Sequence, residues 1–102
     1  MWQTLLLLAV LHHSFGAEYD ANRPITLTGT LTAVEWTNPH AWVYVDVEDA
    51  SGVVAHWSIQ LGSPNGLTKR GWTRTSLHVG DLVTVDGSGA RDGGRMANAR
   101  SV

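Results

Sequence analysis

The chain has 102 residues and a formal net charge of −2, which is one domain's worth of sequence and gives no general electrostatic support for nucleic-acid binding. It contains no cysteine, so disulfides, thiolate metal sites and thiol nucleophiles are excluded. Five tryptophans are many for so short a chain, and tryptophan supplies both core packing and flat binding surface.

An apolar leader opens the chain over residues 1–11. Its apolar run, Leu5–Leu11, is far too short to cross a bilayer, which takes roughly 20 apolar residues. We interpret it as an export signal, although no Lys or Arg precedes it. An uncleaved anchor-like tail and an apolar arm packed on the domain are the alternatives. The leader therefore predicts a periplasmic or secreted protein with no stable transmembrane span.

The site of signal cleavage decides whether two histidines remain in the mature chain. Cleavage before His12 would leave this residue as a free chain end, although the leucine before it is not the small residue expected there. Cleavage after Gly16, with Ser14 two residues earlier, fits the small-residue rule better and would remove both His12 and His13.

Residues 12–24 are expected to form an extended arm, irregular from Glu18 to Pro24, before a barrel over residues 25–102. Ile25–Trp36 alternates apolar and threonine residues, which is typical of a strand with one wet face. Ile25, Leu27, Gly29, Leu31 and Ala33 share the apolar side. The apolar phase then changes to Val34 and Trp36, so we expect a bend or bulge, eased by Gly29.

A hairpin is predicted next, with strands over Ala41–Glu48 and Val53–Leu61. Gly52 closes the loop between them because glycine accepts the left-handed conformation that such a loop needs. This loop places Asp46 across from His56, and Trp42 across from Gln60. The alternating valines of the first strand form its buried side, so Trp42 and Tyr44 lie on the other side.

A short helix and two more strands complete the domain. Ser63 is a good helix N-cap, Pro64 suits the first turn, and Gly71 ends the helix. Residues 72–77 are expected to form a tight turn. Strands are predicted over Leu82–Gly87 and Arg95–Val102, with a glycine-rich loop over residues 88–94.

The element order predicts an all-β fold. Three strands, one short helix and two strands match the five-stranded Greek-key barrel of the oligonucleotide/oligosaccharide-binding (OB) type, with the helix between strands three and four. An open antiparallel sandwich is the alternative. In the OB type, the loop that connects the first two strands lies at the edge of the usual binding face.

Five phrases of the sequence occur together in one protein family. They are His12-His13-Ser14-Phe15, Glu18-Tyr19-Asp20, Glu35-Trp36-Thr37-Asn38-Pro39-His40-Ala41-Trp42, Leu61-Gly62-Ser63-Pro64-Asn65 and Arg70-Gly71-Trp72. By these phrases residues 12–102 resemble an uncharacterised family of small exported bacterial proteins, a domain of unknown function. Its members usually carry a longer leader that ends just before the His-His pair, and they usually continue beyond the last residue of this chain. The resemblance implies export and no particular activity.

His12, His13 and His40 are the candidate metal ligands. Neutral imidazole is a common ligand of copper and zinc, and copper(II) favours tetragonal nitrogen and oxygen sites. An N-terminal His12 would offer its α-amine and its ring nitrogen together, and His40 a third nitrogen. For the His-His pair, the alternatives are a solvated stub and a pair that packs against the barrel. For His40, the alternative is a side chain that caps a backbone carbonyl after the Asn38-Pro39 turn.

Trp42 and Tyr44 are the candidate residues of an aromatic binding face, because aromatic rings stack on sugars and other flat ligands. Trp36 and Trp57 are expected in the core instead. Trp72 lies near Lys69, Arg70 and Arg74, a basic spot that fits either an anion or a solvated helix end.

Catalytic motifs find little support in the sequence. Ser14 lies near histidines without a nucleophile elbow, and no glycine-rich loop has the lysine and helix of a phosphate site. We therefore expect a non-enzymatic binding module of the bacterial envelope, whose partner is a divalent metal ion, copper or zinc, or a small molecule. Glycan or small-molecule binding on the aromatic face is one alternative, and a metal-dependent enzyme is another.

Overall fold

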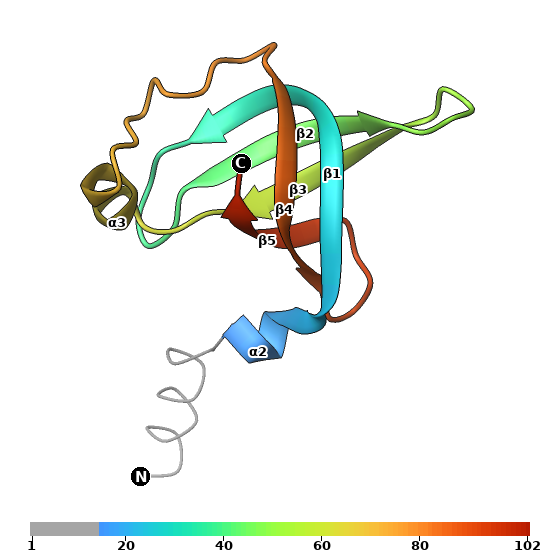
Figure 1. The fold of residues 1–102 in the computed structure, drawn as a ribbon, viewed down its shortest axis with the longest axis horizontal. Helices are drawn as coiled ribbons and strands as arrows, with labels where there is room; N and C mark the ends of the chain where they lie inside the picture. The colour runs from blue at the N-terminus through green and yellow to red at the C-terminus, as the bar shows by residue number, and fades with distance from the viewer. Residues whose placement is uncertain (1–14) are drawn as a thin grey trace, which may run out of the picture.

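The computed structural model describes residues 15–102, which form five strands and two short helices (Figure 1). In chain order the elements are α2 (Phe15–Glu18), β1 (Tyr19–Glu35), β2 (Trp42–Glu48), β3 (Val54–Gln60), α3 (Pro64–Lys69), β4 (Leu82–Ala90) and β5 (Met96–Ser101). The all-β prediction is confirmed. Neither helix in this part of the chain is long and apolar enough to cross a membrane. The leader, His12 and His13 lie outside the described residues.

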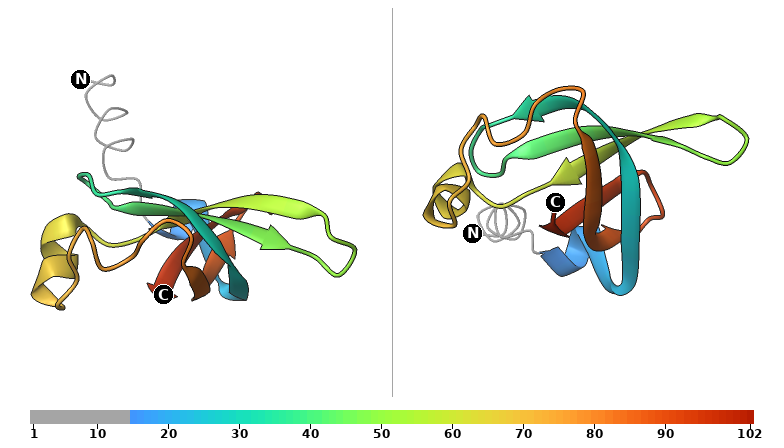
Figure 2. Two further views of the ribbon diagram at one scale, coloured as in Figure 1. Left: turned by 90° about the horizontal axis from the view of Figure 1, so that it is seen from above. Right: turned by 45° about the horizontal axis from the view of Figure 1, so that its top comes forward.

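The strands bond in the order β1-β2-β3-β5-β4, and β4 returns to β1, so that the sheet closes into a barrel. Neighbouring strands are antiparallel except β3 and β5, which run parallel. The length of β1 allows the closure, because its first part pairs with β4 and its last part with β2. The β2–β3 hairpin projects beyond the barrel, at the end opposite α3 (Figure 2).

The predicted change of phase in β1 is confirmed as a bulge. The register with β2 shifts between Leu31 and Ala33, so that the fully buried Leu31 is followed by Val34 on the core side. Ala33, expected on the inner side, pairs with the outward-facing Tyr44 instead. Gly29 is needed for close approach, since a Cβ there would lie 2.2 Å from the backbone oxygen of Asp46.

The stretch over residues 18–24, expected as an irregular arm outside the barrel, belongs to β1 from Tyr19 onwards, and its register with β4 is irregular between Tyr19 and Pro24. Pro24 pairs with Ser88 of β4, and Tyr19 pairs with Ala90 across an irregular register. Most side chains of this stretch are exposed, which explains its polar sequence. Backbone pairing with β4 holds it in the sheet, and such pairing needs no apolar side chain.

The β2–β3 hairpin has the predicted register. Asp46 lies opposite His56 and Trp42 lies opposite Gln60. Gly52 takes the positive φ, +86°, that the connecting loop requires. The barrel core is centred on this hairpin and its neighbours, and its fully buried side chains include Leu31, Val43, Val45, Ile59 and Val85.

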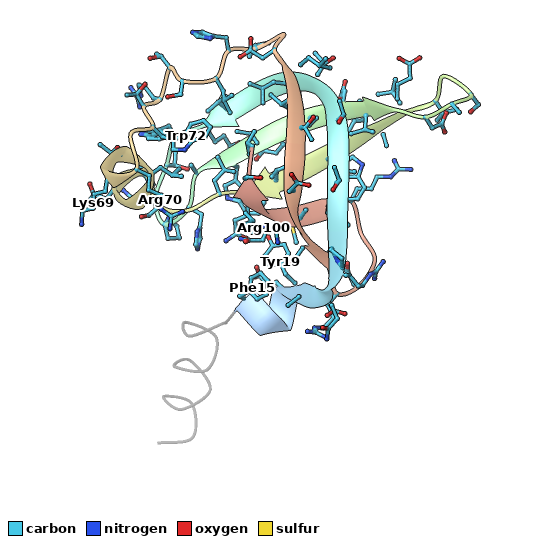
Figure 3. All side chains as sticks on the ribbon, viewed as in Figure 1. Phe15, Tyr19, Lys69, Arg70, Trp72 and Arg100 are labelled. Atoms are coloured by element: carbon cyan, nitrogen blue, oxygen red, sulfur yellow. The ribbon has the colours of Figure 1, made fainter. Side chains whose placement is uncertain are left out.

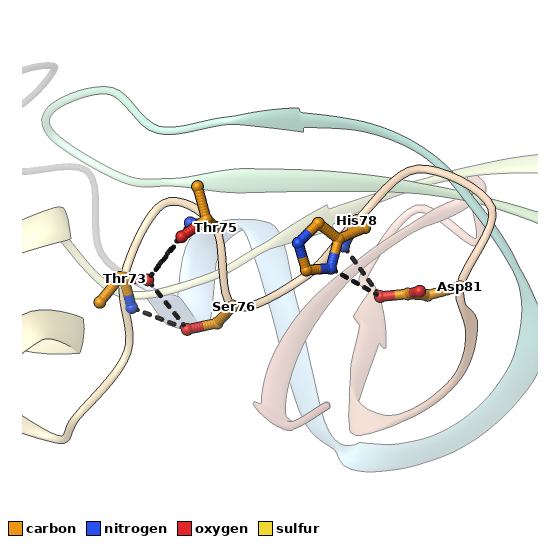
Figure 4. Close-up of polar contacts among 5 residues, drawn as sticks. All are labelled: Thr73, Thr75, Ser76, His78 and Asp81. Atoms are coloured by element: carbon orange, nitrogen blue, oxygen red, sulfur yellow. Dashed lines mark hydrogen bonds and ion pairs between the residues drawn. The ribbon is translucent and has the colours of Figure 1, made fainter.

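The helix α3 begins and ends as predicted. The Ser63 hydroxyl accepts a hydrogen bond from the Gly66 backbone, and Gly71 turns the chain with a φ of +93°. The following connection is held by its own polar groups (Figure 4). Ser76 accepts from the Thr73 backbone at 2.8 Å, and the Asp81 carboxylate accepts from the His78 backbone at 2.8 Å.

The glycine-rich loop predicted over residues 88–94 begins later than expected, because β4 continues to Ala90. A Cβ at Gly87 would lie 2.0 Å from the Asn98 backbone oxygen, so this glycine admits β5 rather than making a turn. The loop is confined to residues 91–95, where Gly93 has a positive φ of +80°.

Candidate functional site

His40 lies where the β2–β3 ladder ends, beside the turn that contains Pro39. Its Nδ1 is 3.1 Å from the Leu61 carbonyl oxygen, and the Ala41 backbone bonds to Leu61 and Gly62 next to it. A carbonyl oxygen can only accept, so Nδ1 carries the hydrogen and donates. The predicted alternative, a histidine that caps a carbonyl, is therefore confirmed. In the neutral ring this contact leaves Nε2 as the nitrogen with a free lone pair.

Metal ligands are not clustered in the part of the chain that the structure describes. No group of three or more His, Asp or Glu side chains within residues 15–102 has the arrangement of a metal site. His40 is half-buried, and His12 and His13 lie outside the described residues. The structure thus describes the position of one of the three predicted ligands, and metal binding by any of them stays a prediction.

Trp42 and Tyr44 lie on the outer side of β2, opposite Gln60 and Ser58 of β3. Both are half-buried, and neither packs against the core cluster. Burial raises the pKa of the Tyr44 hydroxyl, and a hydrogen bond to the Glu35 carboxylate raises it further. Glu35 pairs with Trp42 in the sheet, so the two rings and this carboxylate share one surface.

Tyr19 is a contact that the sequence did not predict. Its hydroxyl donates to the Oε1 atom of Gln60, and both side chains are buried. The ring of Phe15 lies 5.6 Å from the Tyr19 ring (Figure 3). No spacing rule of the sequence predicts this contact, because Phe15 begins α2 and Tyr19 begins β1. These rings bring the start of the described chain to the end of β3, one residue before Leu61.

The predicted pair of Asp46 and His56 makes direct contact. His56 Nδ1 lies 2.5 Å from an Asp46 carboxylate oxygen, on the same side of the sheet as Tyr44. The His56 side chain is 80% exposed, which limits what the pair contributes to stability because solvent screens it. This histidine is remote from His40 in the ladder, at the projecting end of the hairpin.

The tryptophans divide partly as expected. Trp36 and Trp57 are partly buried and pack against the core cluster. Trp72 does the same, although the sequence placed it in a surface basic spot. The Trp72 backbone donates to the Leu67 carbonyl at 3.0 Å, which folds the chain back onto α3 after Gly71.

The family comparison covers nearly the whole chain. A model described as a family of unknown function (DUF6152) matches residues 4–99. No curated protein matches the chain.

Proposed function

The chain belongs to this family of unknown function, and from its own residues we propose that it is a non-enzymatic binding module that holds one copper(II) ion with His40. The observation that carries the proposal is the contact between His40 Nδ1 and the Leu61 carbonyl. Histidines that bind metals usually donate their second ring hydrogen to a carbonyl or carboxylate, which fixes the tautomer and the ring orientation. His40 Nε2 is left as the metal-binding atom.

His12 and His13 are the proposed partners of His40. The contact of Tyr19 with Gln60 ties the start of the described chain to the residue beside Leu61. His13 is only two residues before Phe15. Because an extended chain reaches about 3.5 Å per residue, the chain between them is short, which supports a position of His13 near this end of β3. A mature chain that starts at His12 would also supply its α-amine, and three nitrogens suit copper(II).

We further propose an OB-type Greek-key barrel and an envelope location. The strand order, with a parallel β3–β5 pair and a helix between β3 and β4, supports the barrel type. In this type His40 lies in the loop at the edge of the binding face. The apolar run Leu5–Leu11 supports export to the periplasm or beyond the cell.

Copper titration of the exported protein tests the site. The mass of the same sample first establishes that the chain starts at His12. We expect one copper(II) per chain by calorimetry at pH 7.4, and an affinity at least about tenfold weaker in His40→Gln. The matched control is His56→Gln, which removes an exposed imidazole from the far end of the hairpin and should leave the affinity unchanged. Absence of copper uptake, or equal losses in both variants, would exclude the proposed site.

A glycan site on the aromatic face is the second candidate function. Trp42 and Tyr44 support it because both stand on one outer surface without belonging to the core. The probe is chitotriose, whose rings can stack on indole. We expect Trp42→Ala to weaken binding by about tenfold, since aromatic stacking contributes on the order of 1 kcal/mol or more per ring. Val53→Ala, at an exposed position of the hairpin loop, is the control. Binding that survives Trp42→Ala unchanged would contradict this role.

A further inference from the structure

A small hollow lies between α3 and the end of β5, and the predicted copper site does not use it. It has a volume of about 70 Å³. Arg70 and Trp72 reach it from the turn after α3, and Arg100 reaches it from β5 (Figure 3). The sequence placed Arg70 and Trp72 together in a basic spot, and the fold adds Arg100, which is 30 positions away in the chain.

Both guanidinium groups at the hollow are available to a ligand. Within residues 15–102, the side chains of Arg70 and Arg100 make neither a hydrogen bond nor an ion pair with another residue. Arg91, by contrast, donates from Nε to the Gly16 carbonyl at 2.9 Å. No acidic side chain of the described chain lines the hollow, and the main-chain carboxylate of Val102, which is among the lining residues, forms no ion pair with either arginine. Two guanidinium groups against this one carboxylate leave the hollow with a net positive charge, which favours an anion.

The walls of the hollow are apolar. Leu61 and Leu67 are almost fully buried members of the core cluster, and Trp72 packs beside them. An inorganic anion would meet the arginines and leave these walls without a partner. An anion with a short apolar body uses both, because burial of apolar surface is favourable and a guanidinium group binds a carboxylate through two parallel hydrogen bonds.

We propose that this hollow binds a small organic carboxylate, with the carboxylate on Arg70 and Arg100 and the hydrocarbon part against Leu67 and Trp72. The hollow, at about 70 Å³, is roughly half the size of an engineered apolar cavity of about 150 Å³ that holds benzene, so it fits a hydrocarbon part of a few carbons. The site is independent of the copper proposal: a His40→Gln variant that has lost copper is expected to keep it.

Titration of the full ¹⁵N-labelled chain with butyrate tests the proposal. Trp72→Phe assigns the indole N–H signal of Trp72 among the tryptophans. We expect butyrate to shift this signal to saturation at constant ionic strength. Arg70→Gln and Arg100→Gln should each weaken binding by about tenfold, because each removes a charge-assisted hydrogen-bond donor. Arg74→Gln is the matched control, since Arg74 is an exposed arginine of the same segment that does not line the hollow.

Four results would overturn the proposal. The first is an unchanged Trp72 signal at saturating concentrations of butyrate. The second is an equal loss in Arg74→Gln, which would mean that only the overall charge attracts the anion. The third is an equal response to inorganic phosphate, which would mean that the apolar walls play no part. Retention of binding in both Arg70→Gln and Arg100→Gln, in chains whose indole spectra show the native fold, would also reject it.

Discussion

At the scale of single residues, Tyr19 joins the start of the described chain to the barrel. Its side chain is 1% exposed, and its hydroxyl donates to Gln60, which is 7% exposed. Burial raises the pKa of the Tyr19 hydroxyl to about 12, and the Glu18 charge adds to this rise. Folding therefore favours the protonated hydroxyl, which is also the form that can donate to Gln60.

The Tyr19→Phe variant should lower the free energy of unfolding by roughly 1–2 kcal/mol at pH 7, because the buried Gln60 oxygen loses its donor. The pH dependence follows from the raised pKa. Tyr19 contributes fully to stability below pH 10, which is the ordinary pKa of a tyrosine hydroxyl. This contribution is lost as the pH rises towards the raised pKa of about 12. Urea unfolding of both proteins from pH 7 to pH 12 measures this.

Tyr44 provides the internal control for that experiment. Its pKa is also raised, so some alkaline loss of stability remains in Tyr19→Phe. The difference between the two proteins isolates Tyr19, and it should shrink between pH 10 and pH 12. A difference that stays constant over this range would show that the hydroxyl does not titrate in contact with Gln60.

At the scale of elements, the bend of β1 depends on one missing side chain. A Cβ at Gly29 would lie 2.2 Å from the Asp46 backbone oxygen and 2.9 Å from a Val45 methyl group. The first of these neighbours is backbone of β2 and cannot move without disturbing the ladder. The close approach of β1 and β2 at this point therefore requires glycine.

Gly29→Ala should destabilise the protein by about 1–3 kcal/mol, the usual cost of forcing extra atoms into a packed interior. Gly62→Ala is the matched control. A Cβ there would lie 3.8 Å from the Leu67 side chain, an ordinary van der Waals distance, and the backbone φ is not positive. Thermal unfolding of the two variants is the measurement. Equal midpoints for both would contradict the close-approach explanation.

At the scale of the whole molecule, the sequence predicts the sheet where side chains decide it. The valines of β2 and the Gly52 loop set the register that places Asp46 opposite His56. The sequence predicts strand boundaries less well where backbone pairing alone holds a segment in the sheet. The polar start of β1 and the glycines of β4 are held by the ladder, and no apolar alternation marks them.

The candidate site was predictable in its parts and not in its assembly. His40, Trp42 and Tyr44 stand on residue types and spacing that the sequence displays. Tyr19 and Gln60, which are hydrogen-bonded, lie 41 positions apart in the sequence. Arg70 and Arg100, which line the same hollow, lie 30 positions apart. Only the closed sheet brings such residues together, and no local pattern of the sequence records it.

The parallel pairing of β3 with β5 has a consequence for where the barrel opens transiently. Three residue pairs make that seam: Ser58 with Met96, Ile59 with Ala97, and Gln60 with Asn98. Every other join of the barrel is antiparallel, and parallel pairing is slightly weaker per residue. Transient opening should begin between β3 and β5, where it would first expose the buried Ile59 and Ala97 to solvent. The hydrogen bond from Tyr19 to Gln60, the last residue of β3 in this pairing, should oppose such an opening.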